Sequence, residues 1–382
     1  TYTGSTTINT GALIVTGSLS DSTLVSVSSG ATYNVDISDT IAGLSGAGTV
    51  TTSSSGSKTL TLNVASGSQT FSGVISNGSG NLSLTKTGAG TQILSGTSST
   101  YTGVTTISEG VLSVSTLATG GANSGIGAST SLASNLVLDG GTLQYTGADV
   151  TIDRLFTITD KGGTLDASGT GTWNLGNTGS LGYSGTSTRT LTLTGSGTAV
   201  LVSVLANNTG LTSLTKAGTG TWTLSASSNT YTGTTTVSGG TLKLSNQSTT
   251  SSETFDITSG ATLKLDGGSV SIPTLTGSGY VSGGTFASTL TLGGAGGTQS
   301  FSGLIRDGTE GGKLSVVKTG SGSLTLSGAN TYTGSTTIGA GTLIVTGSLS
   351  DSTVVTLSTS GAVYQVDVAD TIGGLAGVSG TT

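Results

Sequence analysis

The stretch KTGAGTQILSGTSSTYTG occupies residues 86–103 and is written three times in this chain. It returns as KAGTGTWTLSASSNTYTG at residues 216–233 and as KTGSGSLTLSGANTYTG at residues 318–334. A longer run that opens with TYTGSTTI at Thr1 reappears, slightly changed, from Thr331. Nested self-similarity of this kind is typical of repeat architectures and decides the fold before any other feature.

Between the repeats, apolar and hydroxyl residues alternate in short runs, such as TLTLNV (59–64), NLSLTK (81–86) and TLTLTG (190–195). A period of two indicates strands with one buried face. The runs are separated by Gly-Ser, Asn-Gly, Gly-Gly and Asp-Gly pairs, which supply the positive φ angles of tight turns. The nearest approach to a helical stripe, residues 115–132, is broken by glycines. The sequence therefore predicts strands and turns almost throughout.

The composition restricts the partners and the chemistry. The chain has 382 residues, of which 67 are Gly and only 7% are charged, against about 25% in a typical globular protein. It contains no Cys, Met or His, and its net charge is -6. An acidic chain without a basic patch argues against a nucleic-acid partner. No apolar run approaches the roughly 18 residues of a membrane span, so we expect no membrane insertion by this segment. Because the chain has no cysteine, we also expect no disulfides.

Among repeat folds, propellers repeat every 40 to 50 residues or so, and leucine-rich repeats carry an Asn/Cys ladder that is missing here. Short strands, hydroxyl-rich surfaces and irregular glycine turns favour an all-β, parallel β-helix (a β-solenoid rod). In such a fold each coil stacks on the coil before it, so stability is collective. We predict one continuous β-solenoid over residues 1–382. Its repeat modules fall at approximately 1–100, 101–230 and 231–330, with the start of the next super-repeat at 331–382.

The phrase K-T-G-x-G-x-x-x-L-S-G-x-N-T-Y-T-G-x-T-T-I-x-x-G-x-L, clearest at residues 318–343, resembles the passenger-associated repeat of bacterial autotransporters. Matches also cover residues 86–112 and 216–242, with a truncated copy at 1–13. The resemblance implies a right-handed β-helix that is exported to the extracellular face of a bacterial cell. It does not imply an activity, because similar passengers include adhesins, proteases and esterases.

Two residue types recur at fixed places in the repeat and are predicted to be structural. The tyrosines are expected to pack at a corner between strands, with carbohydrate stacking as the alternative; they are Tyr2, Tyr101, Tyr231 and Tyr332. The lysines are expected to be exposed, solubilising charges or else local partners of turn carbonyls; they are Lys86, Lys216 and Lys318.

Few residues offer catalytic chemistry. Without histidine, Ser-His-Asp hydrolysis and imidazole metal sites are excluded, so we predict no enzyme, no catalytic residues and no cofactor. One D-x-x-D-T spacing occurs twice and is predicted to cap turns, with a weak calcium site as the alternative; its carboxylates are Asp36, Asp39, Asp367 and Asp370. The densest charge cluster is predicted to link strand edges by salt bridges, with a glycosidase-like carboxylate pair as the alternative; it comprises Asp149, Asp153, Arg154, Asp160 and Lys161.

Two classes of function remain. In the first, the chain is a structural segment of a long extracellular fibre, stalk or sheath, which associates with itself head to tail or laterally. The repeat that restarts at Thr331 suggests a longer tandem array. In the second, the chain is an adhesive passenger that binds surface or host glycans through exposed aromatic residues. The candidates are Trp173, Tyr183 and Trp222, although Trp222 replaces Leu324 of another copy and is expected to be buried.

Overall fold

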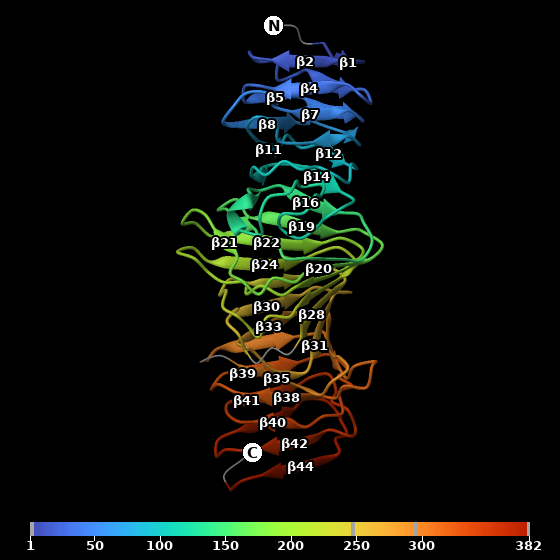
Figure 1. Cartoon of the computed structure of the whole chain (residues 1–382). Coiled ribbons are helices and arrows are strands. Elements are labelled where there is room, and N and C mark those ends of the chain that lie inside the picture. Colours follow the sequence, from blue (N-terminus) through green and yellow to red (C-terminus); the bar gives the residue numbers. More distant parts are fainter. Residues whose placement is uncertain (1–3, 246–248, 294–295, 380–382) are drawn as a thin grey trace. The chain divides into compact units, whose positions relative to one another are not determined.

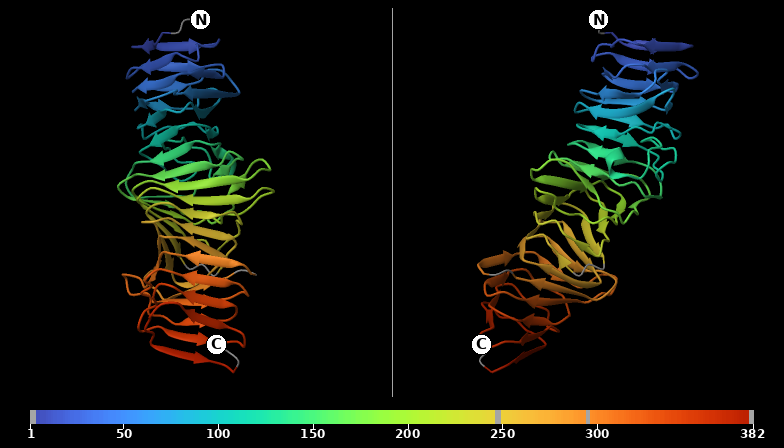
Figure 2. Two further views of the ribbon diagram at one scale, coloured as in Figure 1. Left: turned by 180° about the vertical axis from the view of Figure 1, so that it is seen from behind. Right: turned by 60° about the vertical axis from the view of Figure 1, so that its left-hand side comes forward.

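The computed structural model describes residues 4–245, 249–293 and 296–379. These residues form parallel strands and turns, with one short 3-10 helix, η1 (Ala133–Asn135). The chain divides into two compact units, Thr1–Ser203 (the N-terminal unit) and Val204–Thr382 (the C-terminal unit). Within each unit the strands lie one above another, coil upon coil (Figure 1 and Figure 2). The prediction of an all-β, parallel β-solenoid is confirmed.

One sheet runs the length of the N-terminal unit, and its strands pair in parallel. In stacking order the strands are β1 (Thr6–Ile8), β3 (Leu24–Val27), β6 (Gly43–Gly46), β9 (Ser68–Phe71), β12 (Thr91–Leu94), β14 (Val111–Val114), β16 (Thr142–Tyr145), β19 (Gly163–Ala167) and β22 (Arg189–Thr194).

The other sides of these coils form shorter parallel sheets. A second sheet contains β2 (Ala12–Val15), β4 (Thr32–Val35), β7 (Thr49–Thr51) and β10 (Val74–Ile75). A third contains β5 (Asp39–Ile41), β8 (Ser57–Asn63), β11 (Asn81–Thr87), β13 (Thr105–Ile107), β15 (Leu136–Leu138), β18 (Thr157–Ile158) and β21 (Gly182–Tyr183). The last comprises β17 (Val150–Ile152), β20 (Thr172–Leu175) and β23 (Thr198–Leu201).

The C-terminal unit is built in the same way. Its first two stacks are β24 (Thr212–Lys216), β27 (Thr235–Val237), β30 (Thr254–Ile257) and β33 (Thr274–Gly277), and β25 (Thr221–Leu224), β28 (Thr241–Ser245), β31 (Thr262–Asp266), β34 (Tyr280–Gly283) and β37 (Leu304–Arg306). A short stack pairs β26 (Ser228–Asn229) with β29 (Thr249–Thr250). A fourth stack contains β32 (Gly268–Ile272), β35 (Ser288–Leu292), β38 (Leu314–Lys318), β40 (Thr336–Ile338), β42 (Val354–Leu357) and β44 (Gly374–Gly377). The last contains β36 (Thr298–Phe301), β39 (Ser323–Leu326), β41 (Thr342–Val345) and β43 (Val363–Val366).

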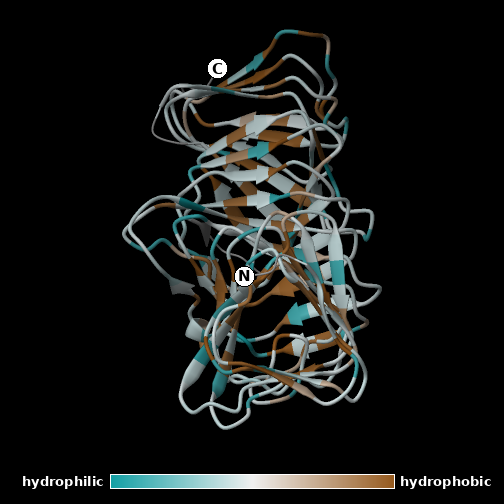
Figure 3. Ribbon diagram, turned by 90° about the horizontal axis from the view of Figure 1, so that it is seen from above, coloured by the Kyte–Doolittle hydropathy of each residue, from teal (hydrophilic) through white to brown (hydrophobic). Residues whose placement is uncertain are grey.

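The period of two builds the core, because alternate residues of each strand point inward. In β11 the inward residues are Leu82, Leu84 and Lys86, and all three are buried. Parallel register places Leu60 of β8 beside Leu84, so inward residues of successive coils form continuous columns. In Figure 3, brown hydrophobic positions alternate with white or teal positions along the strands. Each coil buries only a few side chains, and the stack as a whole supplies the stability.

The coils differ in length while the register is kept. In the long sheet, Ile8 of β1 is in register with Val27 of β3, and Val114 of β14 is in register with Tyr145 of β16. The coil from Val114 to Tyr145 therefore contains many more residues than the coil from Ile8 to Val27. The extra residues are accommodated in turns. The turn after each repeat lysine needs a glycine with positive φ, and Gly88, Gly218 and Gly320 have φ angles of 70°, 67° and 72°.

Candidate functional site

The lysine of each repeat is the last inward-facing residue of its strand. The alternation in NLSLTK puts Lys86 on the same face as Leu82 and Leu84. Lys86 and Lys216 are 0% exposed and Lys318 is 2% exposed. The prediction that these lysines are exposed, solubilising charges is therefore wrong. The alternating pattern itself contained the signal, since the lysine stands two residues after a buried leucine or valine in all three copies.

Each buried ammonium group donates hydrogen bonds to three backbone carbonyls. The Nζ atom of Lys86 lies 2.6 Å from the oxygens of Thr87 and Gly88, and 3.2 Å from that of Glu109 in the next coil. Lys216 and Lys318 repeat this arrangement, at 2.5–3.2 Å from the carbonyls of Ala217, Gly218 and Gly239, and of Thr319, Gly320 and Ala340. This geometry corresponds to the alternative that the lysines serve turn carbonyls.

Burial lowers the proton affinity of these lysines, because a charged group is disfavoured away from water. Burial lowers the pKa of Lys86 and of Lys216 to about 8 and also lowers the pKa of Lys318. The surrounding carbonyl dipoles offset part of this cost, since hydrogen bonds to the charged form favour it.

The tyrosines of TYTG are buried at the opposite end of these paired strands, just before the strand that follows the phrase. Tyr101, Tyr231 and Tyr332 are at most 1% exposed. Their hydroxyl groups share hydrogen bonds of 2.8, 2.6 and 2.6 Å with the hydroxyls four residues later, of Thr105, Thr235 and Thr336. Burial raises the pKa of all three phenols. Tyr2 lies outside the described residues. Rings placed in this way pack in the core and are not accessible to a carbohydrate.

The glycine of TYTG is needed because the previous coil approaches its backbone. A Cβ atom on Gly103, Gly233 or Gly334 would lie 2.4, 2.4 or 2.3 Å from a backbone carbonyl oxygen of that coil. The oxygens belong to Leu82, Thr212 and Leu314. Real Cβ atoms do not come so close to an oxygen, so any side chain would push the two coils apart.

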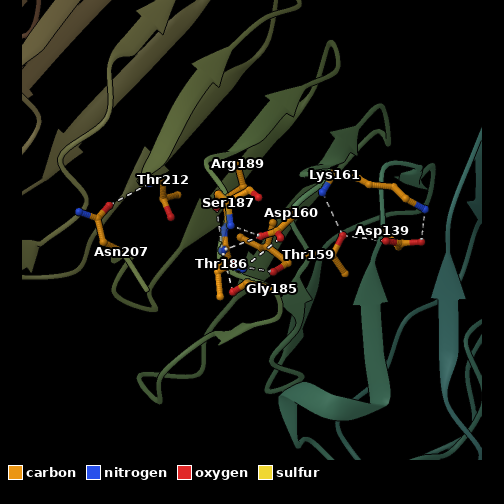
Figure 4. Close-up of polar contacts among 11 residues, drawn as sticks. Asp139, Thr159, Asp160, Lys161, Gly185, Thr186, Ser187, Arg189, Asn207 and Thr212 are labelled. Atoms are coloured by element: carbon orange, nitrogen blue, oxygen red, sulfur yellow. Dashed lines mark hydrogen bonds and ion pairs between the residues drawn. The ribbon is translucent and has the colours of Figure 1, made fainter. Parts of the chain in front are cut away.

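A further element beside the tyrosine and glycine was missed in the sequence. Asn207 accepts a hydrogen bond from the N–H of Thr212 at 2.9 Å through its Oδ1 atom (Figure 4). The same oxygen accepts the N–H of Thr232 at 3.2 Å, and the Nδ2 atom of Asn207 donates to the Thr232 hydroxyl. Asn77 and Asp307 hold the other two copies through the equivalent threonines. An Asn or Asp one coil before the TYTG threonine was the available signal. We call the tyrosine, glycine and Asn/Asp of one repeat a repeat corner; the repeat lysine lies at the other end of the same paired strands.

The pH dependence of stability should report the buried lysines. Between about pH 8 and the usual lysine pKa of 10.5, the unfolded state holds protons that the folded state has released. The free energy of unfolding should therefore rise with pH in this range. Above pH 10 the buried tyrosines cause the free energy of unfolding to fall as the pH rises, because they ionise only in the unfolded state. We expect the rise between pH 8 and 10 in urea unfolding, and a flatter profile in Lys216→Met.

Lys161→Met is the matched control, because the Lys161 side chain is 64% exposed. This variant should keep the wild-type slope. A Lys216→Met profile that is as steep as the wild-type profile would contradict the prediction.

Three of the four carboxylates of the D-x-x-D-T pairs accept hydrogen bonds from the neighbouring coil. Asp36 accepts the Ser53 hydroxyl and the N–H groups of Ser53 (2.6 Å) and Ser54 (3.0 Å), which lowers its pKa. Asp39 is mostly buried, which raises its pKa, and it accepts the N–H of Leu19. Asp370 accepts the N–H of Leu349, and Asp367 accepts the side-chain amide of Gln365. These contacts are those of turn caps. Within the described residues, no three His, Cys, Asp or Glu side chains are grouped as a metal ion would require.

The fold separates the predicted charge cluster, and two of its five residues form the predicted kind of salt bridge to a neighbouring coil. Lys161 pairs with Asp139 at 2.8 Å, and Asp160 pairs with the buried Arg189 at 3.0 Å (Figure 4). Asp149 and Asp153 instead accept backbone N–H groups, of Thr172 and Gly120. Arg154 is 3% exposed, and its guanidinium donates to the carbonyls of Ala118, Thr119, Ala122 and Gly127 and to the Ser129 hydroxyl. Arg154 thereby fixes the long excursion between β14 and β15.

The aromatic residues considered for glycan binding are not free surface groups. Trp173 is 1% exposed, so its candidacy is wrong, and Trp222 is buried as expected. Tyr183 is half-buried, in register with the inward Ile158, and the Arg189 guanidinium lies 5.5 Å from its ring centroid. These rings lie on the inward faces of their strands.

Comparison with known proteins agrees with this geometry. The profile of the Passenger-associated-transport-repeat family matches residues 1–15, 84–114, 214–244 and 316–345, which include the lysine, tyrosine and glycine of the three described repeats. The chain is 46% identical over 186 residues to the protein named Adhesin BmaC autotransporter of Brucella suis biovar 1 (strain 1330). That alignment covers 47% of this chain but 5% of the relative. No solved structure matches the chain.

The location follows from the same matches. Among the described residues, none belongs to a helix with the length and hydropathy of a membrane span. The repeats and the autotransporter relative indicate an extracellular position at the cell surface. The chain is therefore a β-solenoid of the bacterial autotransporter passenger type, built with passenger-associated-transport repeats.

Proposed function

We propose that this chain acts as a stalk, a structural spacer that gives length and stiffness to a cell-surface adhesin. The observations that carry the proposal are the repeat lysine and the repeat corner, which recur three times with the same contacts. In these three described copies the ammonium and phenol groups are buried and bonded to the rod itself. These groups therefore serve the interior of the rod.

The repeat lysine and the repeat corner support stiffness because each makes hydrogen bonds that join two coils. The Lys86 ammonium reaches the Glu109 carbonyl of the next coil, and Asn77 accepts the N–H of Thr102. A hydrogen bond typically contributes about 0.5–1.5 kcal/mol, and more when one partner is charged. Sliding or tilting one coil on another would break several such bonds together, so the rod resists bending at every corner.

Adhesion and the absence of catalysis belong to the same proposal. The relative that matches this chain is named an adhesin, and a stalk would hold the binding region of such a protein away from the cell. The chain has no histidine, and its buried lysines and tyrosines are used in packing. We therefore propose no enzymatic role.

An in-frame deletion of residues 1–330 from the whole surface protein tests the stalk. Because residue 331 restarts the phrase of residue 1, the junction should keep the coil register. About 16 coils at about 4.8 Å each would shorten the rod by roughly 75 Å. Electron microscopy of the purified protein should show that change, and cells should adhere less well while the isolated binding region keeps its affinity.

Two results would contradict the stalk. One is an unchanged rod length after the deletion, and the other is unchanged adhesion of cells that carry the shortened protein. Filaments longer than a single chain would instead indicate assembly of copies end to end.

A further inference from the structure

One aromatic side chain of the C-terminal unit projects from a loop whose backbone is fixed. Phe286 lies between β34 and β35 and is 63% exposed. Its N–H donates to Asp266 Oδ1 at 3.2 Å, and the N–H of Thr285 donates to the same oxygen at 2.7 Å. The Phe286 carbonyl accepts the Ser288 hydroxyl at 3.3 Å. Hydrogen bonds thus hold the loop backbone before and after the Phe286 side chain, so the ring is exposed to solvent while the backbone stays ordered.

The surroundings of this ring are unusually charged for a chain with 7% charged residues. Lys243 pairs with Asp266, with 2.5 Å between nitrogen and oxygen, and Lys264 pairs with Glu310 at 2.6 Å. The second carboxylate oxygen of Glu310 accepts the Thr285 hydroxyl at 2.9 Å. The two lysines are neighbours in register on adjacent strands. Their mutual repulsion is compensated by the two carboxylates, which leaves a neutral, ordered set of donors and acceptors.

A further donor continues the same column of the sheet. Lys264 is in register with Ser282, and Ser282 is in register with Arg306. The Arg306 guanidinium lies 4.8 Å from the ring centroid of Tyr280. Arg306 thus covers one face of Tyr280, whereas Phe286 is exposed. Its chain neighbour Thr285 bonds Glu310, which pairs with Lys264. We call Phe286, Thr285, Glu310 and Lys264 the Phe286 surface.

We propose that the Phe286 surface binds a neutral hexopyranose unit of a glycan. One face of a pyranose carries C–H groups that can lie on the Phe286 ring. The hydroxyls at its edge need both acceptors and donors, which Glu310, Thr285 and Lys264 supply. Because these groups are already held by their own contacts, little side-chain freedom is lost on binding. The paired charges favour a neutral sugar over an anionic one.

A protein partner fits this surface less well. A stable protein interface buries about 800 Å² on each side, with an apolar and aromatic centre. The Phe286 surface offers one large apolar side chain among charged and hydroxyl groups. A single sugar ring needs no more than one aromatic contact. The proposal does not depend on the stalk role, because binding at one loop and stiffness of the rod rest on different residues.

Titration of the whole purified chain with lactose and with 3′-sialyllactose, followed by NMR or calorimetry, tests the proposal. We expect lactose to bind more tightly than the sialylated sugar, and Phe286→Ala to weaken binding at least about tenfold. Phe286→Tyr should retain binding, because it keeps the ring. Phe286→Trp should show a shift in tryptophan emission on addition of lactose, since Trp173 and Trp222 are buried.

Leu211→Ala is the matched control, because Leu211 is another exposed apolar side chain of the same unit, at 49%. It should bind lactose like the wild type, and all variants should keep the wild-type unfolding midpoint. The proposal is overturned if neither sugar binds, if only the sialylated sugar binds, or if binding survives Phe286→Ala. None of these results would affect the rod-length test of the stalk.

Discussion

Tyr231→Ala is expected to lower the free energy of unfolding of the C-terminal unit by about 3–5 kcal/mol, as large aromatic-to-alanine changes in cores do. Tyr231 is 1% exposed and belongs to the repeat corner, so the truncated side chain leaves a cavity between stacked coils. The backbone of the corner is fixed by bonds to the preceding coil, including that from the Thr230 N–H to the Leu205 carbonyl. It therefore cannot easily collapse to fill the space.

Tyr231→Phe separates the ring from its hydroxyl. It removes only the 2.6 Å hydrogen bond to Thr235, whose hydroxyl keeps that of Ser252 at 3.0 Å. We expect a loss of about 1 kcal/mol. Urea unfolding followed by Trp222 fluorescence, in a Trp173→Phe background, measures both variants in the right unit.

Tyr280→Ala is the control for residue type. Tyr280 points outward from the same unit and contacts Arg306, so its loss should cost less than about 1 kcal/mol. If Tyr280→Ala and Tyr231→Ala destabilise the unit equally, the packing role of the corner tyrosine is wrong. Because stability in a solenoid is a sum over neighbouring coils, the effect should also be largest in hydrogen exchange near Tyr231.

Gly103→Ala should destabilise the N-terminal unit by about 3 kcal/mol, at the upper end of the usual cost of overpacking. The new Cβ would lie 2.4 Å from the carbonyl oxygen of Leu82 and 2.3 Å from the Ser83 hydroxyl. The hydroxyl can rotate away, but the carbonyl is backbone. It is already bonded to the Gly103 N–H at 3.0 Å. Relief therefore requires the two coils to separate, which breaks that bond.

Gly17→Ala provides the comparison for Gly103→Ala. Gly17 is in the same unit, but a Cβ there would meet nothing within 4 Å. It should change the urea midpoint very little, or raise it slightly by restricting the unfolded chain. If Gly103→Ala leaves the free energy of unfolding unchanged, the coils can move apart freely, which would contradict the proposed stiffness of the corner.

The fold was predictable because its signals are local. Period-two alternation in runs such as NLSLTK identifies strands and also their inward faces, and glycine pairs mark the turns. The same alternation places Lys86 inward, although charge alone suggests the surface. The repeated phrase and its resemblance to autotransporter passengers identified the solenoid and its location. In these respects the sequence by itself determined the architecture of the protein.

Only the tertiary structure decided which residues meet between coils. The partners of Gly103 and of Asn77 lie about one coil away in sequence, and coil length varies from turn to turn, so spacing along the chain does not identify them. Exposure of Phe286 and burial of Trp173 likewise depend on where a loop leaves the stack. Periodicity assigns a residue to a face of its strand. Its partner is set by the register of the neighbouring coil, which is a property of the assembled stack.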